Sequence, residues 1–160
     1  MLSIQTILHP TDFSARSEYA FRLACALARD HGARLIVLHV VPPPQSVGYD
    51  EMPITSPLSP DYKKELEDKL RRFMAVDPNL RVAGRLEEGF PADEILRTAQ
   101  ETKADLIVMG THGRTGLGRL LMGSVAEQVM RKAACPVLTV KTPVAESNPP
   151  AGQAKALANA

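Results

Sequence analysis

The sequence predicts a doubly wound α/β fold in three layers, with a five-stranded parallel sheet between two layers of helices. Apolar segments of strand length alternate along the chain with segments whose apolar residues recur at helical spacing. Two strand segments, residues 34–41 and 104–110, are nearly continuous in Ile, Leu and Val, as expected of parallel strands buried on both faces. Right-handed crossovers between five such strands give the strand order 3-2-1-4-5.

Each element has a local signal in the sequence. The strands are expected over residues 3–10, 34–41, 81–88, 104–110 and 136–141. The third of these alternates apolar with basic residues, so we place it at an edge of the sheet. The first helix follows Ser14, a good N-cap residue, and ends at Gly32. The second begins at Ser59, the third near Pro91 and the fourth at Ser124.

Length and composition are those of one globular domain. Of 160 residues, 44% are hydrophobic and 23% charged, and the net charge of +1 gives no overall attraction to nucleic acid or to a membrane surface. We expect the domain over residues 1–142, with a mobile proline-rich loop at 42–58, and a disordered tail at 143–160. No signal peptide or membrane-spanning run is found, so the expected location is the cytoplasm.

A glycine-rich segment follows the fourth strand. Residues 110–124, GTHGRTGLGRLLMGS, include arginines but no acidic residue. In a sheet of this order, ligands bind where the winding direction reverses, at the carboxyl ends of the first and fourth strands. The segment HPTDFS, residues 9–14, follows the first strand and therefore meets the glycine-rich segment there. This convergence predicts a ligand site at that edge of the sheet.

The residue types in the glycine-rich segment favour an anionic ligand. Gly110 allows a sharp turn at the strand end, and Gly113 lets a phosphate approach main-chain amides. Gly123 and Ser124 open the fourth helix, whose dipole favours an anion, while Arg114 supplies positive charge. The segment is not a Walker motif, because it lacks the lysine and the hydroxyl residue of that motif.

Several of these residues have alternative, purely structural roles. Ser124 and Glu127 have the spacing of a capping box, which would start the fourth helix without any ligand. Asp12 stands at the start of the first helix, where aspartate often caps the turn. His9 and His39 end neighbouring strands, but no further metal-binding side chains complete a zinc site, so we expect no metal ion held by the protein itself.

The segment DLIVMGTHGRTGLGRLLMGSVAEQVMRKAACPVLTVK, with ILHPTDFS and VLHVV before it, resembles the universal stress protein family and its Rossmann-like fold. The resemblance covers residues 3–141 and includes the Gly-x2-Gly-x9-Gly-Ser signature of the ATP-binding branch. It implies that ATP, ADP or AMP binds, with Mg²⁺ held by the phosphates. The implied contacts are Gly110, Gly113, Gly123, Ser124 and Val125 for phosphates and ribose, Pro10, Thr11 and Asp12 at the first turn, and Val40 for adenine.

The sequence therefore predicts an ATP-binding regulatory protein of the stress response, a nucleotide-dependent switch with at most weak ATP hydrolysis. No carboxylate is placed to act as a base, because Glu127 is assigned to the helix cap. The alternative is a homodimeric interaction scaffold that needs no nucleotide. A phosphate-accepting receiver domain would need paired acids after the first strand and an aspartate after the third, and the sequence has neither.

Self-association is expected through the last strand, residues 137–141, which is an apolar edge strand. The family resemblance similarly implies a homodimer through this strand. We expect a downstream protein partner, and neither nucleic acid nor a membrane as a ligand.

Overall fold

The computed structural model describes residues 3–43, 58–75, 77–111 and 123–141. Within these residues, one five-stranded sheet has the order β3-β2-β1-β4-β5, and its neighbouring strands are parallel. The strands are β1 (Thr6–Pro10), β2 (Arg34–Val41), β3 (Val82–Glu88), β4 (Leu106–Gly110) and β5 (Val137–Val140). The helices are α1 (Ala15–His31), α2 (Pro60–Met74), α3 (Pro91–Glu101) and α4 (Ser124–Lys132). The predicted fold class and strand order are confirmed.

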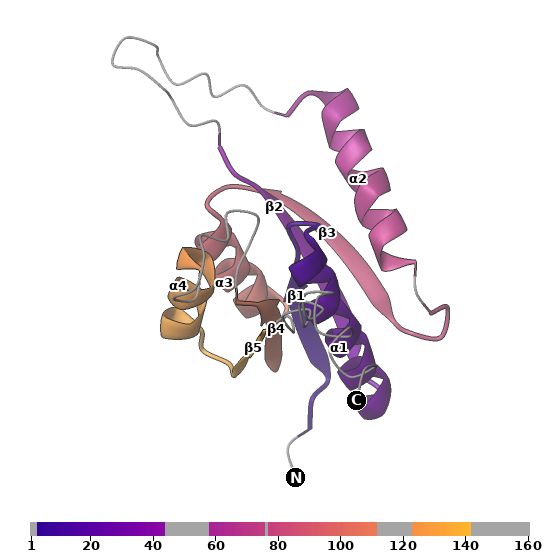
Figure 1. Ribbon diagram of the computed structural model, residues 1–160, viewed down its shortest axis with the longest axis vertical. Coiled ribbons are helices and arrows are strands. Elements are labelled where there is room, and N and C mark those ends of the chain that lie inside the picture. Colours follow the sequence, from indigo (N-terminus) through magenta and orange to yellow (C-terminus); the bar gives the residue numbers. More distant parts are fainter. Residues whose placement is uncertain (1–2, 44–57, 76, 112–122, 142–160) are drawn as a thin grey trace, which may run out of the picture.

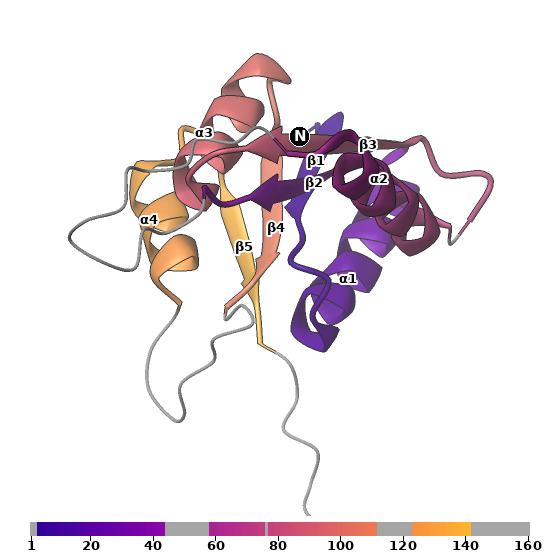
Figure 2. The ribbon, with the colours of Figure 1, turned by 90° about the horizontal axis from the view of Figure 1, so that it is seen from above.

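The sheet separates two layers of helices, with α1 and α2 on one face and α3 and α4 on the other (Figure 1 and Figure 2). Each layer of helices packs against its face of the sheet and forms a separate hydrophobic core. Leu35 and Val37 of β2 belong to the core that includes α1, while Ile36 and Leu38 belong to the core that includes α3 and α4. Since successive side chains of a strand point to opposite faces, a central strand must be apolar throughout. This explains the uninterrupted apolar run of β2.

The helix starts agree with the sequence, but the cap of α4 differs from the predicted one. Ser14 caps α1 and Ser59 caps α2, each through a side-chain oxygen that accepts a main-chain N–H, and Gly32 ends α1 in the left-handed conformation that glycine favours. At α4, however, the N-cap residue is Gly123, without a side-chain hydrogen bond, and Ser124 is already helical. The capping-box interpretation of Ser124 was wrong, because its side chain lies one position too late to cap the helix.

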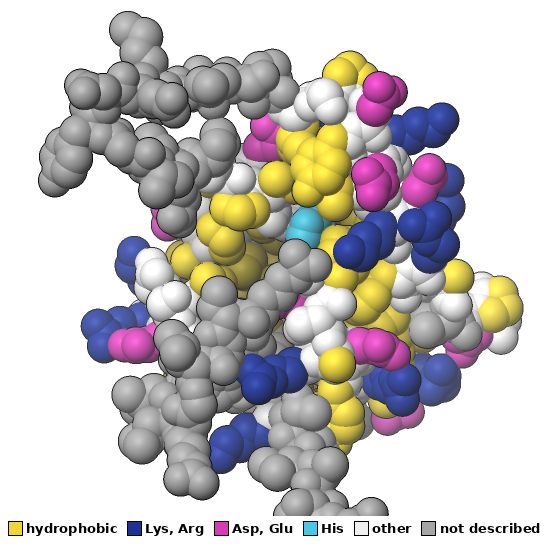
Figure 3. Space-filling model, turned by 45° about the horizontal axis from the view of Figure 1, so that its top comes forward, with side chains coloured by type: hydrophobic (Ala, Val, Ile, Leu, Met, Phe, Trp, Pro, Cys, Tyr) yellow, Lys and Arg dark blue, Asp and Glu magenta, His cyan; other side chains and the backbone are white. Residues whose placement is uncertain are grey.

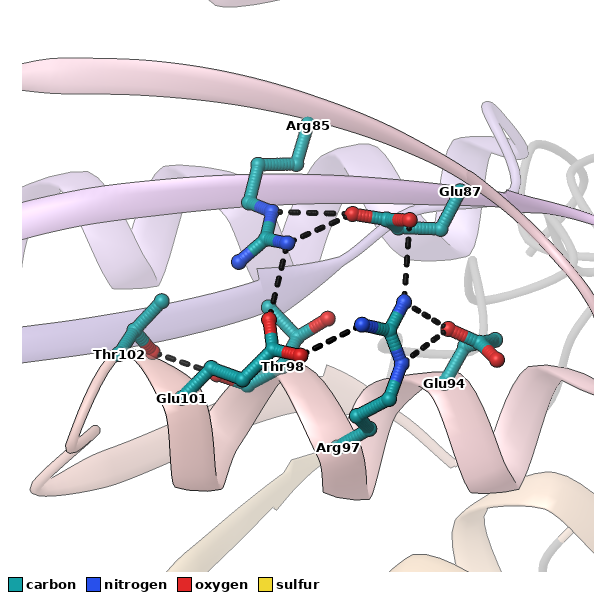
Figure 4. Close-up of polar contacts among 7 residues, drawn as sticks. All are labelled: Arg85, Glu87, Glu94, Arg97, Thr98, Glu101 and Thr102. Atoms are coloured by element: carbon teal, nitrogen blue, oxygen red, sulfur yellow. Dashed lines mark hydrogen bonds and ion pairs between the residues drawn. The ribbon is translucent and has the colours of Figure 1, made fainter.

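The edge strand β3 is joined to α3 by a network of ion pairs (Figure 4). Arg85 bonds to Glu87 at 2.7 Å and to Glu101 at 3.0 Å, and Arg97 bonds to Glu87 at 3.0 Å as well as to Glu94 and Glu101. Arg85 and Glu87, which interrupt the apolar pattern of β3, thus face α3. The strand order confirms the predicted edge position of β3, where side chains remain in contact with water.

The remaining expectations on organisation concern residues that are largely outside the described part of the chain. The loop predicted at 42–58 lies there apart from residues 42, 43 and 58, and the predicted tail at 143–160 lies there entirely. Among the described residues, no helix combines the length and the apolar character needed to cross a membrane.

Candidate functional site

The carboxyl ends of β1, β2 and β4 meet at one edge of the sheet, which Figure 3 turns toward the viewer. Pro10 at the end of β1 pairs with Leu38 of β2, and the main-chain N–H of Thr11 donates to the Leu38 carbonyl at 2.8 Å. Leu8 pairs with Ile107 of β4, so the continued register brings the segment after β1 beside Gly110. The turn after β1 therefore meets the described start of the glycine-rich segment, as predicted.

The turn after β1 is fixed by its own side chains. The Thr11 hydroxyl accepts a hydrogen bond from the N–H of Phe13 at 3.0 Å and lies against the Ser17 hydroxyl. One carboxylate oxygen of Asp12 accepts from the N–H of Ser14 at 3.0 Å. Asp12 therefore has the local capping role that the sequence offered as an alternative. A rigid turn of this kind also holds a carboxylate in a constant position at the edge of the sheet.

Phe13 completes this turn in an unusual conformation. Its φ of 61° lies in the left-handed region, which costs a residue other than glycine about 1–3 kcal/mol. The Phe13 ring packs against the ring of His39 at 4.4 Å between centroids and edge-on against Phe73 at 5.6 Å. The Lys69 ammonium lies 4.7 Å from the centroid of the Phe13 ring. These contacts with β2 and α2 offset the cost of the backbone conformation.

His39 supports the same turn from β2. Its Nδ1 donates to the carbonyl oxygen of Thr11 at 2.8 Å, and the side chain is half-buried. Figure 3 shows a histidine side chain bordered by hydrophobic side chains near the centre of this face. Sequence reasoning favoured a structural role for His39 over a metal site, but it did not identify the Thr11 carbonyl as the partner of its side chain. A histidine at a strand end gives no signal of the carbonyl to which it donates.

The β4 side of the edge is closed by two main-chain hydrogen bonds. The N–H of Thr111 donates to the carbonyl of Val140 at 3.2 Å, and the N–H of Gly123 donates back to the carbonyl of Thr111 at 2.7 Å. The chain thus leaves β4 and returns to start α4 at nearly the same point. Gly113 and Arg114 lie between these two positions in the sequence, outside the described residues.

The first turn of α4 presents main-chain N–H groups at this edge. Helix geometry leaves the amides of Ser124 and Val125 without intrahelical acceptors, and no side chain caps this helix start in the described structure. The positive end of the helix dipole adds to the attraction for an anion. Ser124 is exposed, so its hydroxyl reaches solvent beside these amides. The arrangement is suited to hydrogen bonding with phosphate oxygens.

Val40 lies near the end of β2, with its side chain in the core formed with α3 and α4. The residue is 9% exposed, so contacts with a ligand would use mainly its backbone. Pro10, at the end of β1, is half-buried. Both residues lie on the strands that frame the Asp12 turn.

His9 is the most perturbed titratable group near this edge. It is fully buried, and loss of hydration lowers its pKa to about 4, although Nδ1 donates to the Val108 carbonyl at 2.8 Å. Its ring lies near those of Phe21 and Phe73, at 5.5 and 6.3 Å between centroids. Among the described residues, no group of three or more His, Cys, Asp or Glu side chains is arranged to hold a metal ion.

Comparison with known proteins extends this description. The sequence profile of the universal stress protein family matches residues 3–141. Universal stress protein MJ0531 of Methanocaldococcus jannaschii is 40% identical over 142 residues, which are 88% of this chain and 84% of that protein.

Two similar solved structures carry nucleotides. The universal stress protein from Archaeoglobus fulgidus in complex with dAMP has a TM-score of 0.62 and 25% identity, over 88% of this chain and 100% of that one. A universal stress protein in complex with cAMP has a TM-score of 0.59 and 30% identity, over 88% of this chain and 99% of that one. Together with the family profile over nearly the whole described chain, these likenesses show that the chain belongs to the universal stress protein family.

Proposed function

We propose that this protein binds an adenine nucleotide at the carboxyl ends of β1 and β4 and acts as a nucleotide-dependent regulatory switch. The observation that carries the proposal is the start of α4. Its amides have no side-chain cap in the described structure, and the hydrogen bond from Gly123 to Thr111 holds them beside the end of β4. A polyphosphate satisfies such amides and the helix dipole together. The complexes of related proteins with cAMP and dAMP support the same ligand class.

Each site residue has a role in this proposal. The amides of Ser124 and Val125, the glycines at 110, 113 and 123, and the Arg114 side chain contact the phosphates. The Asp12 carboxylate, fixed by the N–H of Ser14, accepts hydrogen bonds from ribose hydroxyls or from the adenine amino group. Pro10, Thr11 and the backbone of Val40 border the base.

ATP is the ligand we assign, with ADP and AMP as the forms that a switch would distinguish from it. Mg²⁺ would be held by the phosphates, because the described residues offer it no cluster of three or more ligands. When bound, the ion neutralises phosphate charge.

Hydrolysis is expected to be slow or absent. The sequence predicted that Glu127, in the first turn of α4, caps the helix. Its carboxylate instead pairs with the guanidinium of Arg131 at 2.9 Å. Asp12 is already bonded to the turn. Neither is an uncommitted general base for an attacking water. Turnover of ATP by the purified protein at an ordinary enzyme rate, about 10 per second, would contradict this part of the proposal.

Calorimetric titration of the purified protein with ATP, ADP and AMP tests the proposal. We expect saturable binding of one adenine nucleotide per chain. Asp12→Ala should weaken it at least about tenfold, roughly 1.4 kcal/mol, because the ligand loses a charged hydrogen-bond acceptor. Gly113→Val should weaken it further by blocking the approach of a phosphate.

Asp30→Ala is the matched control. It removes the same charge from an exposed position near the far end of α1, so nucleotide affinity should be unchanged. A wild-type protein that binds none of the three nucleotides at saturating concentrations would favour the nucleotide-independent scaffold instead. Equal losses in the Asp12 and Asp30 variants would show that overall charge, rather than the turn, determines binding.

A further inference from the structure

We propose that Phe13 is a positioning residue that couples the Asp12 turn to helix α2, so that nucleotide binding and the docking of α2 stabilise each other. The proposal rests on the proposed nucleotide site. It adds a route by which occupancy of that site reaches an element that need not contact the ligand.

The contacts of Phe13 join the two regions directly. Its backbone belongs to the turn that holds the Asp12 carboxylate, and its N–H donates to Thr11. Its ring lies between His39 of β2 and two residues of α2, Lys69 and Phe73. The ring contacts help to hold Phe13 in its left-handed conformation, with φ of 61°. Release of α2 therefore removes part of the support of the turn.

Helix α2 is well suited to respond, because little of it is buried. Among its residues Pro60–Met74, Leu66 and Leu70 are buried, while Phe73 and Met74 are partly buried against the core. Figure 1 shows α2 along the outer side of the sheet, over β3. A helix attached through so few apolar side chains opens locally at a small cost in free energy, so the Phe13 contacts are a substantial part of its attachment.

Thermodynamic linkage makes the coupling reciprocal. If the turn binds nucleotide more tightly when the Phe13 ring is held by α2, then bound nucleotide must favour docked α2 by the same factor. The structure thus assigns α2 as an element whose docking reports the nucleotide state. The Phe13 ring is the contact that transmits it.

Hydrogen exchange measured by mass spectrometry, with and without saturating ATP, tests this coupling. In the wild type, ATP should slow exchange in peptides from α2 as well as in the Asp12 turn, whereas peptides from α3 serve as the internal reference. Phe13→Ala removes the ring contacts that support the turn, so it should raise the Kd for ATP about tenfold. In this variant, ATP should no longer slow hydrogen exchange in α2, even when the site is saturated. Phe13→Tyr, which retains the ring, should restore both.

Lys69→Gln provides a second variant that leaves the turn and the core intact. It removes the cation over the Phe13 ring, so we expect about a two- to fivefold loss of affinity and a smaller slowing of exchange in α2. This surface change keeps the test valid if Phe13→Ala fails to fold.

The outcomes separate the two proposals. A wild-type protein that binds no nucleotide refutes the proposed function and the coupling with it. A wild-type protein that binds ATP while exchange in α2 stays unchanged, or a Phe13→Ala protein with unchanged affinity and exchange, refutes the coupling alone.

Discussion

His9 shows how one buried side chain can make the stability of the whole protein depend on pH. The imidazole has no contact with water, and its Nε2 atom has no hydrogen-bond partner in the described structure. Protonation would place a charge among the rings of Phe21 and Phe73, and the pKa accordingly falls to about 4. The folded protein therefore keeps His9 neutral with Nδ1 as the donor to Val108.

This predicts a loss of stability on mild acidification. The unfolded chain protonates His9 near pH 6.5 and the folded chain only near 4, so His9 has no effect on the free energy of unfolding above pH 6.5 and lowers it as pH falls through this window. The loss reaches about 3 kcal/mol at pH 4. Urea unfolding of the wild type and His9→Asn, at several pH values from about 7 to 4, measures it.

The His9→Asn variant keeps a donor for the Val108 carbonyl but does not titrate. It should have a lower free energy of unfolding than the wild type at neutral pH. This difference in free energy should shrink by about 3 kcal/mol as the pH is lowered to about 4, the pKa of His9 in the folded protein. A difference that stays constant across this range would show that His9 is not responsible.

At the scale of single elements, the two edge strands, β3 and β5, differ in how their exposed edges are shielded from pairing with another chain. The ion pairs of β3 with α3 surround one edge with charge. In contrast, β5 is short and apolar, and its Leu138 residue is 37% exposed. Exposed apolar edge strands are usually covered or paired, so we propose that β5 forms the interface of a homodimer.

Light scattering coupled to gel filtration tests this dimer. Leu138→Lys should yield monomers, because a desolvated lysine in each copy of a symmetric interface is unfavourable. Val140 is less suitable for this test, since its side chain is buried in the core that includes α1 and a lysine there is expected to destabilise the fold. Tyr62→Lys, at an exposed aromatic residue of α2, is the control and should remain dimeric. A dimer that persists in the Leu138→Lys variant would place the interface elsewhere.

Most elements could be predicted from the sequence because their signals are local. The apolar run of β2 follows from burial on both faces, and the caps Ser14 and Ser59 follow from side-chain chemistry at the helix starts. Helix α4 begins at Ser124 as predicted, but its N-cap is Gly123 rather than Ser124, because serine and glycine both suit an N-cap and only the fold decides between them. The first strand begins at Thr6 rather than residue 3, since solvent-accessible residues precede it.

At the scale of the whole molecule, the location of the candidate site could be predicted from the sequence, but the contacts that hold the Asp12 turn in place could not. The order of strands brings the turn after β1 to the end of β4, and the alternation of strands and helices together with right-handed crossovers predicted that order. The left-handed Phe13 and the hydrogen bond from His39 to Thr11 could not be predicted, because both depend on contacts between residues distant in sequence. Glycine is the residue normally expected at such a φ, so the local sequence gave no indication of Phe13.

The position of the bound nucleotide is the central claim. Titration of the ¹⁵N-labelled protein with ATP, followed by NMR of its assigned amides, locates the site directly. We expect the largest shifts on Asp12 and Phe13, on Gly110, and on Ser124 and Val125. Shifts confined to the opposite end, where Arg29, Asp77 and Arg81 line a cavity of about 270 Å³, or no shifts at saturating ATP, would contradict the proposed site.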